Sequence, residues 1–179
     1  MKRPALFIAI ATFAGLWTCA SALAAEDWDA CKMLLKADVD GAFAPRVFAT
    51  GSPGHDKAPS SPKLADVSSC TYSSAGASDK DRLTVTLLAR RSPEGESKVT
   101  PQSIREGEIK LKGVPVNVPG LGGGAHWVNL VCSAPALIRL NVFRGKREWL
   151  VFSATSQTTD TDVAVTGLTQ IAKAAVARM

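Results

Sequence analysis

The sequence predicts an α+β fold, in which a mainly antiparallel sheet has an N-terminal helix and a C-terminal helix packed on one face. Apolar residues recur at helical spacing near both ends of the chain, and several segments between them alternate between apolar and polar residues, as strands do. The order of these elements is not the strand–helix–strand repeat of a parallel sheet. A length of 179 residues suits one such domain.

Residues 1–24 have the three zones of a secretory signal peptide. A basic start at 1–3 precedes an apolar stretch at 5–16, and 22–24 supplies small residues in the A-x-A cleavage pattern. The apolar stretch is shorter than the ~20 residues that cross a bilayer, which argues against a retained anchor. We therefore expect a periplasmic or secreted domain over 25–179, with no transmembrane segment after cleavage.

Cys19 offers an alternative to simple cleavage, because an acylated cysteine would tether the protein to a membrane. Such a cysteine needs small residues just before it. Here Trp17 is bulky and Thr18 stands where Gly or Ala is usual. Cleavage near Ala24 is therefore the expected outcome.

The charge balance argues against nucleic-acid binding. Removal of Lys2 and Arg3 with the signal would lower the formal charge of +5 by two, and no clustered basic face stands out. The short basic clusters, Lys110 with Lys112 and the cations of residues 139–147, are expected to be a solvated edge rather than a polyanion site.

Three cysteines remain after cleavage, and they allow three pairings with one thiol left over. An oxidising compartment favours one bridge. We prefer Cys31 with Cys70, because this bridge closes a loop around the most Pro- and Gly-rich stretch, a constraint worth ~3–4 kcal/mol in the chain-entropy model. Cys132 lies in an apolar run without a C-x-x-C spacing, so we expect a buried free thiol there; an intermolecular bridge or a redox site are the alternatives.

The first half of the domain is expected to hold a helix, a loop and a hairpin. Residues 28–43 have helical spacing, with a break near 36–38. Residues 50–63 have no apolar pattern and predict a mobile loop. Residues 82–90 alternate as a strand, with Leu83, Val85, Leu87 and Ala89 on one face, and residues 70–72 form an earlier strand that pairs with it.

The second half begins with a short helix, for which Thr100 is the expected N-cap and Pro101 the first helical residue. Ile109 and Leu111 then alternate with charged residues, as a strand would. Residues 114–118 also alternate, but Pro115 and the following Pro119 place them at a sheet edge.

A hairpin is predicted over 137–152, with Gly145 and Lys146 as a two-residue turn. This register pairs Val142 with Trp149 and Leu140 with Val151, and it sets Arg144 opposite Arg147, where the two charges would splay into solvent. Residues 160–179 predict the terminal helix, with acids at its start and bases near its end. Its expected core stripe is Val163, Leu168, Ile171, Ala172, Ala175 and Val176.

No motif for catalysis, a cofactor or a metal is recognised. The Gly-rich run at 120–124 lacks the Lys-Ser/Thr ending of a phosphate loop, so a turn is the better interpretation. His55 and His126 are the two histidines, and neither shares a ligand spacing with a cysteine. We therefore expect no cofactor and no metal.

Three short features resemble a known group of proteins. They are Cys31-Lys32-Met33-Leu34-Leu35 on a helix, Cys70-Thr71-Tyr72 opening a strand, and Val118-Pro119-Gly120-Leu121-Gly122 before a hairpin and a terminal helix. This pattern resembles small exported bacterial proteins, often lipoproteins, that share an uncharacterised α+β domain. The resemblance implies a bridge between the first two cysteines and supplies no catalytic residues. Gly123 stands where that group often has an acid.

Three functional hypotheses follow. The leading one is an exported, non-enzymatic envelope protein that binds or assists another macromolecule. The second is a small-molecule carrier or sensor with a pocket between helix and sheet, lined by Trp127, Trp149 and Phe152; the aromatics are otherwise core residues. The third is an unrecognised enzyme with His126 as the candidate base. Trp127, Trp149 and His126 are thus the candidate ligand-facing residues.

Overall fold

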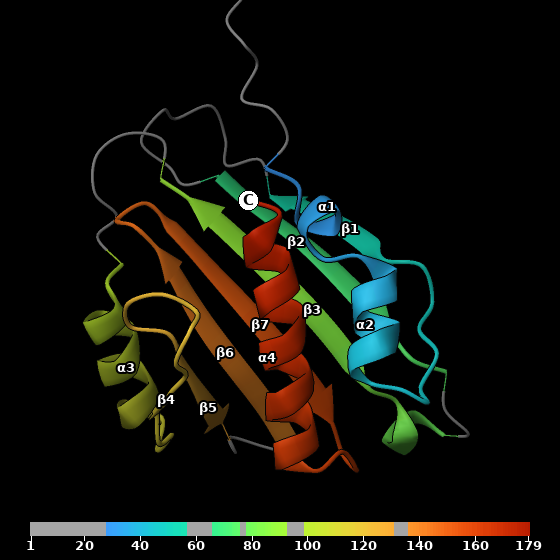
Figure 1. Ribbon diagram of the computed structural model, residues 1–179. Coiled ribbons are helices and arrows are strands. Elements are labelled where there is room, and N and C mark those ends of the chain that lie inside the picture. The colour runs from blue at the N-terminus through green and yellow to red at the C-terminus, as the bar shows by residue number, and fades with distance from the viewer. Residues whose placement is uncertain (1–27, 57–65, 76–77, 93–98, 131–135) are drawn as a thin grey trace, which may run out of the picture.

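The computed structural model describes residues 28–56, 66–75, 78–92, 99–130 and 136–179. Among these residues the strands form one antiparallel sheet in the order β1-β2-β3-β7-β6-β5-β4 (Figure 1). The strands are β1 (Ser52–Asp56), β2 (Asp66–Ser73), β3 (Thr84–Arg91), β4 (Val116–Asn117), β5 (His126–Leu130), β6 (Ala136–Arg144) and β7 (Glu148–Ser156).

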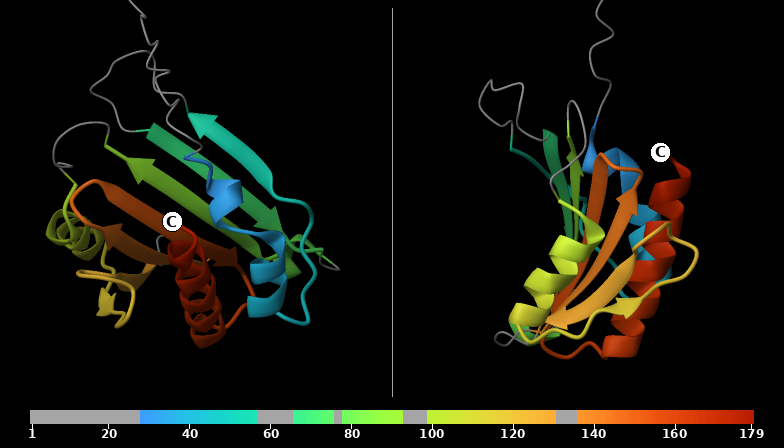
Figure 2. Two further views of the ribbon diagram at one scale, coloured as in Figure 1. Left: turned by 45° about the horizontal axis from the view of Figure 1, so that its top comes forward. Right: turned by 90° about the vertical axis from the view of Figure 1, so that its left-hand side faces the viewer.

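Helices cover both faces of this sheet. The N-terminal helices α1 (Ala30–Met33) and α2 (Lys36–Ala42) and the C-terminal helix α4 (Thr161–Ala177) lie on one face. Helix α3 (Pro101–Lys110) lies on the other face, beside β5 and β6 (Figure 2). The α+β class, with N- and C-terminal helices on one face, is therefore confirmed. No helix among the described residues is long and apolar enough to cross a membrane.

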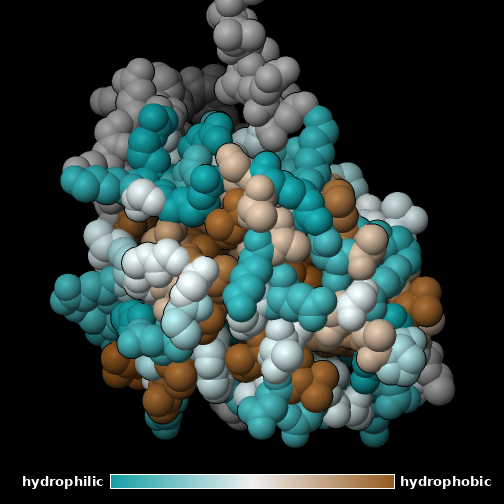
Figure 3. Space-filling view, viewed as in Figure 1, coloured by the Kyte–Doolittle hydropathy of each residue, from teal (hydrophilic) through white to brown (hydrophobic). Residues whose placement is uncertain are grey.

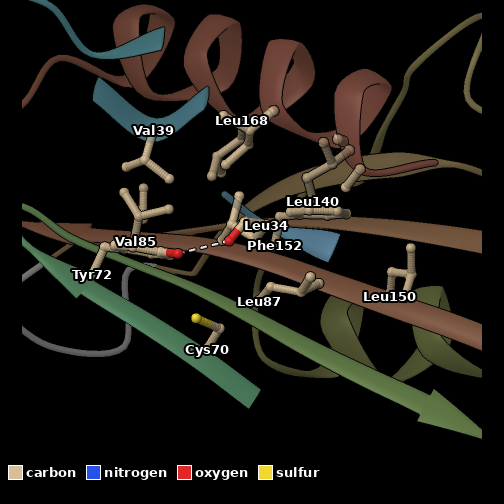
Figure 4. Packing of buried hydrophobic residues seen from close by; sticks show 14 of the residues in the cluster. Leu34, Val39, Cys70, Tyr72, Val85, Leu87, Leu140, Leu150, Phe152 and Leu168 are labelled. Atoms are coloured by element: carbon tan, nitrogen blue, oxygen red, sulfur yellow. Dashed lines mark hydrogen bonds between the residues drawn. The ribbon is translucent and has the colours of Figure 1, made fainter. Parts of the chain in front are cut away.

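The main core lies between the sheet and α1, α2 and α4. The predicted alternation in β3 is confirmed, since Val85, Leu87 and Ala89 are all fully buried. Leu168 of α4 packs above Leu140 and Phe152 of the sheet (Figure 4). In α4 the expected stripe is right except at Val163, which is exposed; the helix instead turns Ala164 and Gly167 inward.

A disulfide and two hydrogen bonds fasten the N-terminal helices to β2. The predicted Cys31–Cys70 bridge is present, with an S–S distance of 2.01 Å. The Tyr72 hydroxyl donates to the carbonyl oxygen of Leu34 at 2.7 Å (Figure 4), and the Ala30 amide donates to Ser68 Oγ at 2.9 Å. The predictions for residues 1–24 and for Cys132 lie outside the described residues.

The loop predicted over 50–63 is wrong in its first part. Residues Ser52–Asp56 form β1, an edge strand that pairs antiparallel with β2. The segment lacks an apolar pattern because it lies at the border of the sheet, where Pro53 and Gly54 are tolerated. Residues 57–65 lie outside the described part of the chain.

The helix predicted at Thr100 begins where expected but runs further. Thr100 Oγ1 accepts a hydrogen bond from the Ser103 amide at 3.1 Å, and Pro101 is the first helical residue. The helix continues to Lys110, so the strand expected around Ile109 and Leu111 is wrong. Their alternation with charged residues instead marks the exposed end of α3 and its cap. The edge strand predicted at 114–118 is confirmed only at Val116–Asn117, which form β4 at the edge of the sheet.

The predicted hairpin exists as β6 and β7, but its register differs by one residue. Leu140 pairs with Phe152, and Arg144 faces Glu148 rather than Arg147. Three residues, 145–147, form the turn, with Gly145 at a φ of 56°. The longer turn replaces a repulsive pair of arginines by an ion pair of 3.3 Å between Arg144 Nη1 and Glu148 Oε2.

Candidate functional site

A buried polar cluster lies between α3 and the sheet face opposite α4. Glu108 enters from α3, while His126 of β5 and Asn141 of β6 are paired neighbours in the sheet. Their exposed fractions are 2%, 0% and 0%. Buried polar groups are costly unless they are hydrogen-bonded, so the geometry of this cluster must satisfy each of them.

The hydrogen bonds within the cluster do satisfy them. His126 Nε2 lies 2.8 Å from Glu108 Oε2, and Asn141 Nδ2 donates to Glu108 Oε1 at 2.8 Å. His126 Nδ1 lies 2.9 Å from the carbonyl oxygen of Gly124, which can only accept, so Nδ1 carries a hydrogen. One further proton must then lie between Nε2 and the Glu108 carboxyl. The pair is neutral overall whichever of the two atoms holds that proton.

The cluster reaches the surface through Trp149. Its indole Nε1 donates to Asn141 Oδ1 at 3.2 Å. Its ring is parallel to that of Phe143, with centroids 6.1 Å apart, and Phe143 in turn lies 6.3 Å from the His126 ring. The Arg90 guanidinium lies 5.5 Å from the indole centroid. Hydrogen bonding and ring packing together fix the orientation of this partly exposed side chain.

Trp149 and Phe143 form one wall of a pocket of about 220 Å³. The pocket lies between the start of α3 and the β6–β7 turn, and its other lining residues are Val99, Thr100, Pro101, Gly145, Lys146 and Glu148. Small-molecule sites usually enclose ~300–1,000 Å³. This pocket therefore has room for about one ring or one apolar side chain.

The predicted ligand-facing residues divide between the two faces of the sheet. His126 and Trp149 lie on the α3 face, close to the pocket. Trp127 follows His126 along β5, so its side chain lies on the opposite face, against the main core. Phe152 is fully buried in that core. The pocket predicted from Trp127, Trp149 and Phe152 together is therefore wrong, because only Trp149 lines the pocket between α3 and the sheet.

Sequence reasoning missed Glu108, Asn141 and Phe143. Asn141 carried a usable signal, since it is a lone amide between Leu140 and Val142 in a strand. Glu108 carried none, because acids are common on exposed helices. Only the packing of α3 against β5 and β6 turns this one inward.

The cluster holds Trp149, which lines the pocket. His126 is fully buried, both of its ring nitrogens have partners, and no hydroxyl or thiol contacts it among the hydrogen bonds of the described residues. Asn141 donates its amide N–H to the Glu108 carboxyl. In a metal site the amide oxygen would be the ligand, so this arrangement differs from a set of metal ligands. Within the described parts of the chain, no group of three or more His, Cys, Asp or Glu residues could hold a metal.

Comparisons with known protein families, with curated proteins and with solved structures give no match.

Proposed function

We propose that this is an exported, non-enzymatic protein that binds another protein. The pocket beside Trp149 would receive one apolar side chain of that partner. The observation that carries this proposal is a preformed, ring-lined pocket of about 220 Å³ whose wall is held by buried hydrogen bonds. Pockets that receive one anchoring side chain are typical centres of protein–protein binding.

The construction of the wall supports this proposal. Trp149 is held by Asn141, and Asn141 is held by Glu108, so the ring keeps its place without a ligand. A rigid wall loses little conformational entropy on binding, which favours affinity. Lys146 and Glu148 add charged groups at the rim, where polar residues usually surround an apolar centre.

Two observations support the proposals that the protein is not an enzyme and that it is exported. The burial of His126 speaks against its use as a base, since a reacting proton must come within hydrogen-bond reach. The Cys31–Cys70 bridge is the kind of bond that persists in an oxidising compartment, as expected of an exported chain.

The test is capture of partners from envelope extracts with three forms of the protein. Val99→Trp should fill the pocket, whereas Val163→Trp adds the same ring on the exposed outer side of α4. We expect a specific protein to be held by the natural chain and by Val163→Trp but lost with Val99→Trp. A partner held equally by all three forms would contradict a role for the pocket, and turnover of a substrate would contradict the non-enzymatic proposal.

A small-molecule carrier or sensor is the second candidate, and the same pocket favours it only for a molecule with one ring. Titration with small aromatic envelope metabolites, followed by tryptophan fluorescence, separates the two. Saturable quenching by such a metabolite at low micromolar concentration, together with no protein partner, would favour the carrier.

A further inference from the structure

Apolar side chains gather on the surface where α3 ends and β4 begins. Four large hydrophobic residues are exposed within this short stretch, with Val114 at 74% and Ile109 at 59%. In Figure 3 hydrophobic surface collects at the lower left, over the end of α3 and β4. We name this surface the 109–116 patch; its apolar members are Ile109, Leu111, Val114 and Val116.

The charges within the 109–116 patch have one sign. Lys110 and Lys112 alternate with its first apolar residues, and both are exposed. From Ile109 to Arg147 the chain contains no Asp or Glu at all. Glu108, the nearest acid before this segment, is buried and bonded to His126. Glu106, one turn before Lys110, is exposed, and its carboxylate accepts a hydrogen bond from Gln102. The patch therefore combines apolar side chains with positive charge and no negative charge of its own.

The backbone at Lys112 is a second, independent observation. After α3 ends, the Gly113 amide donates to the Glu108 carbonyl at 2.9 Å and the Lys112 amide to the Ile109 carbonyl at 2.9 Å. This is the Schellman ending of a helix, in which glycine is usual at the left-handed position. Here Lys112 takes that position, with a φ of 62°. Lysine is less favourable than glycine in this conformation, and its presence here places a second positive charge beside Leu111.

We propose that the 109–116 patch binds the surface of an anionic phospholipid membrane. The apolar side chains would enter the boundary between head groups and acyl chains, and the two lysines would contact the phosphates. Lipid fits better than a protein partner because the apolar residues lie on an exposed helix end and turn, and none of them lines the pockets beside Trp149, at the β6–β7 turn or on α4. The proposal is independent of the pocket beside Trp149, which lies at the other end of α3.

The test is sedimentation with vesicles of phosphatidylcholine alone and with vesicles containing equal phosphatidylglycerol, using the exported, disulfide-bonded protein. We expect binding only to the anionic vesicles. Lys110→Gln and Lys112→Gln should each weaken it roughly 5-fold. Ile109→Ser with Val114→Ser should weaken it about 10-fold or more. The matched controls, Lys173→Gln and Val163→Ser on exposed positions of α4, should change it less than about twofold.

Lys112→Gly separates loss of charge from loss of fold. This variant should unfold at a higher temperature than the natural chain and still bind the anionic vesicles more weakly. Equal binding to both kinds of vesicle, or no binding, would overturn the proposal. So would binding that the patch variants leave unchanged, or a self-association or protein contact that these variants abolish instead.

Discussion

Replacing Glu108 by alanine tests the buried cluster directly, and we expect it to lower the free energy of unfolding by about 3–4 kcal/mol. The change leaves His126 Nε2 and Asn141 Nδ2 without the carboxyl oxygens that now lie 2.8 Å from each of them. A buried polar group without its partner costs about 1–3 kcal/mol, and two are affected. Asn141 Nδ2 also lies 3.3 Å from His126 Nε2, and this remaining contact keeps the expected loss below the sum of two full penalties. The better helix propensity of alanine returns a few tenths of a kcal/mol.

The matched control is Glu106→Ala, the same change on the same helix. Glu106 is exposed, and its carboxylate accepts a hydrogen bond of 2.9 Å from Gln102 Nε2. Its loss should cost no more than about 0.5 kcal/mol.

Urea denaturation followed by circular dichroism measures both variants, and the melting temperature of Glu108→Ala should fall by roughly 10 °C. The indole of Trp149 should also lose its fixed orientation, which near-ultraviolet circular dichroism detects. Equal stability of Glu108→Ala and Glu106→Ala would refute the reasoning, because it would mean that the buried carboxyl supports nothing.

Three further results are expected. Replacing Cys31 and Cys70 by serine removes a bridge with a sequence separation of 39, so the free energy of unfolding should fall by about 4 kcal/mol in urea titrations; a loss under about 1 kcal/mol would contradict the constraint. Burial, and then the charges of three nearby aspartates, raise the pKa of Tyr72 above 10.0. As the pH rises, Tyr72 therefore ionises in the unfolded chain before it ionises in the folded chain. The free energy of unfolding that the natural chain has above Tyr72→Phe should be full below pH 10 and should be lost as the pH rises through the folded pKa. An excess that grows with pH would contradict this. Lys112→Gly should raise the free energy of unfolding by about 1 kcal/mol, since glycine suits the left-handed backbone there, whereas a loss of stability would show that the side chain stabilises the turn.

Alternation was enough to predict β3 and the hairpin of β6 and β7, because one face of these strands is buried under helices. No strand was predicted at β1 or β5. The pairing register of β6 and β7 was not predictable in the same way. A two-residue turn and a three-residue turn around Gly145 fit the local sequence equally well. Only the ion pair of Arg144 with Glu148 and the packing of both faces select the longer turn.

The one-residue difference in the register of β6 and β7 also prevented prediction of the cluster around Trp149. In the expected register Trp149 lies on the face opposite Asn141, so no contact between them could be inferred. In the observed register Phe143 pairs with Trp149, and Asn141 lies on the same face. Glu108 was not predicted as part of the cluster for a second reason, because the helix starting at Thr100 was expected to end before it. His126 and Trp149 were thus named as candidates, but the cluster that joins them depends on long-range packing.

The central claim is that the pocket beside Trp149 accepts one apolar side chain, and an NMR titration tests it most directly. The isotope-labelled protein is titrated with N-acetyl-phenylalaninamide, and with N-acetyl-glycinamide as control, while the indole N–H signals are followed. The pocket predicts a saturable shift of the Trp149 signal with a Kd on the order of 1 mM. It also predicts no matching shift at Trp127 and loss of the effect in Val99→Trp. No saturable shift at Trp149, or an equal shift at Trp127, would contradict the account.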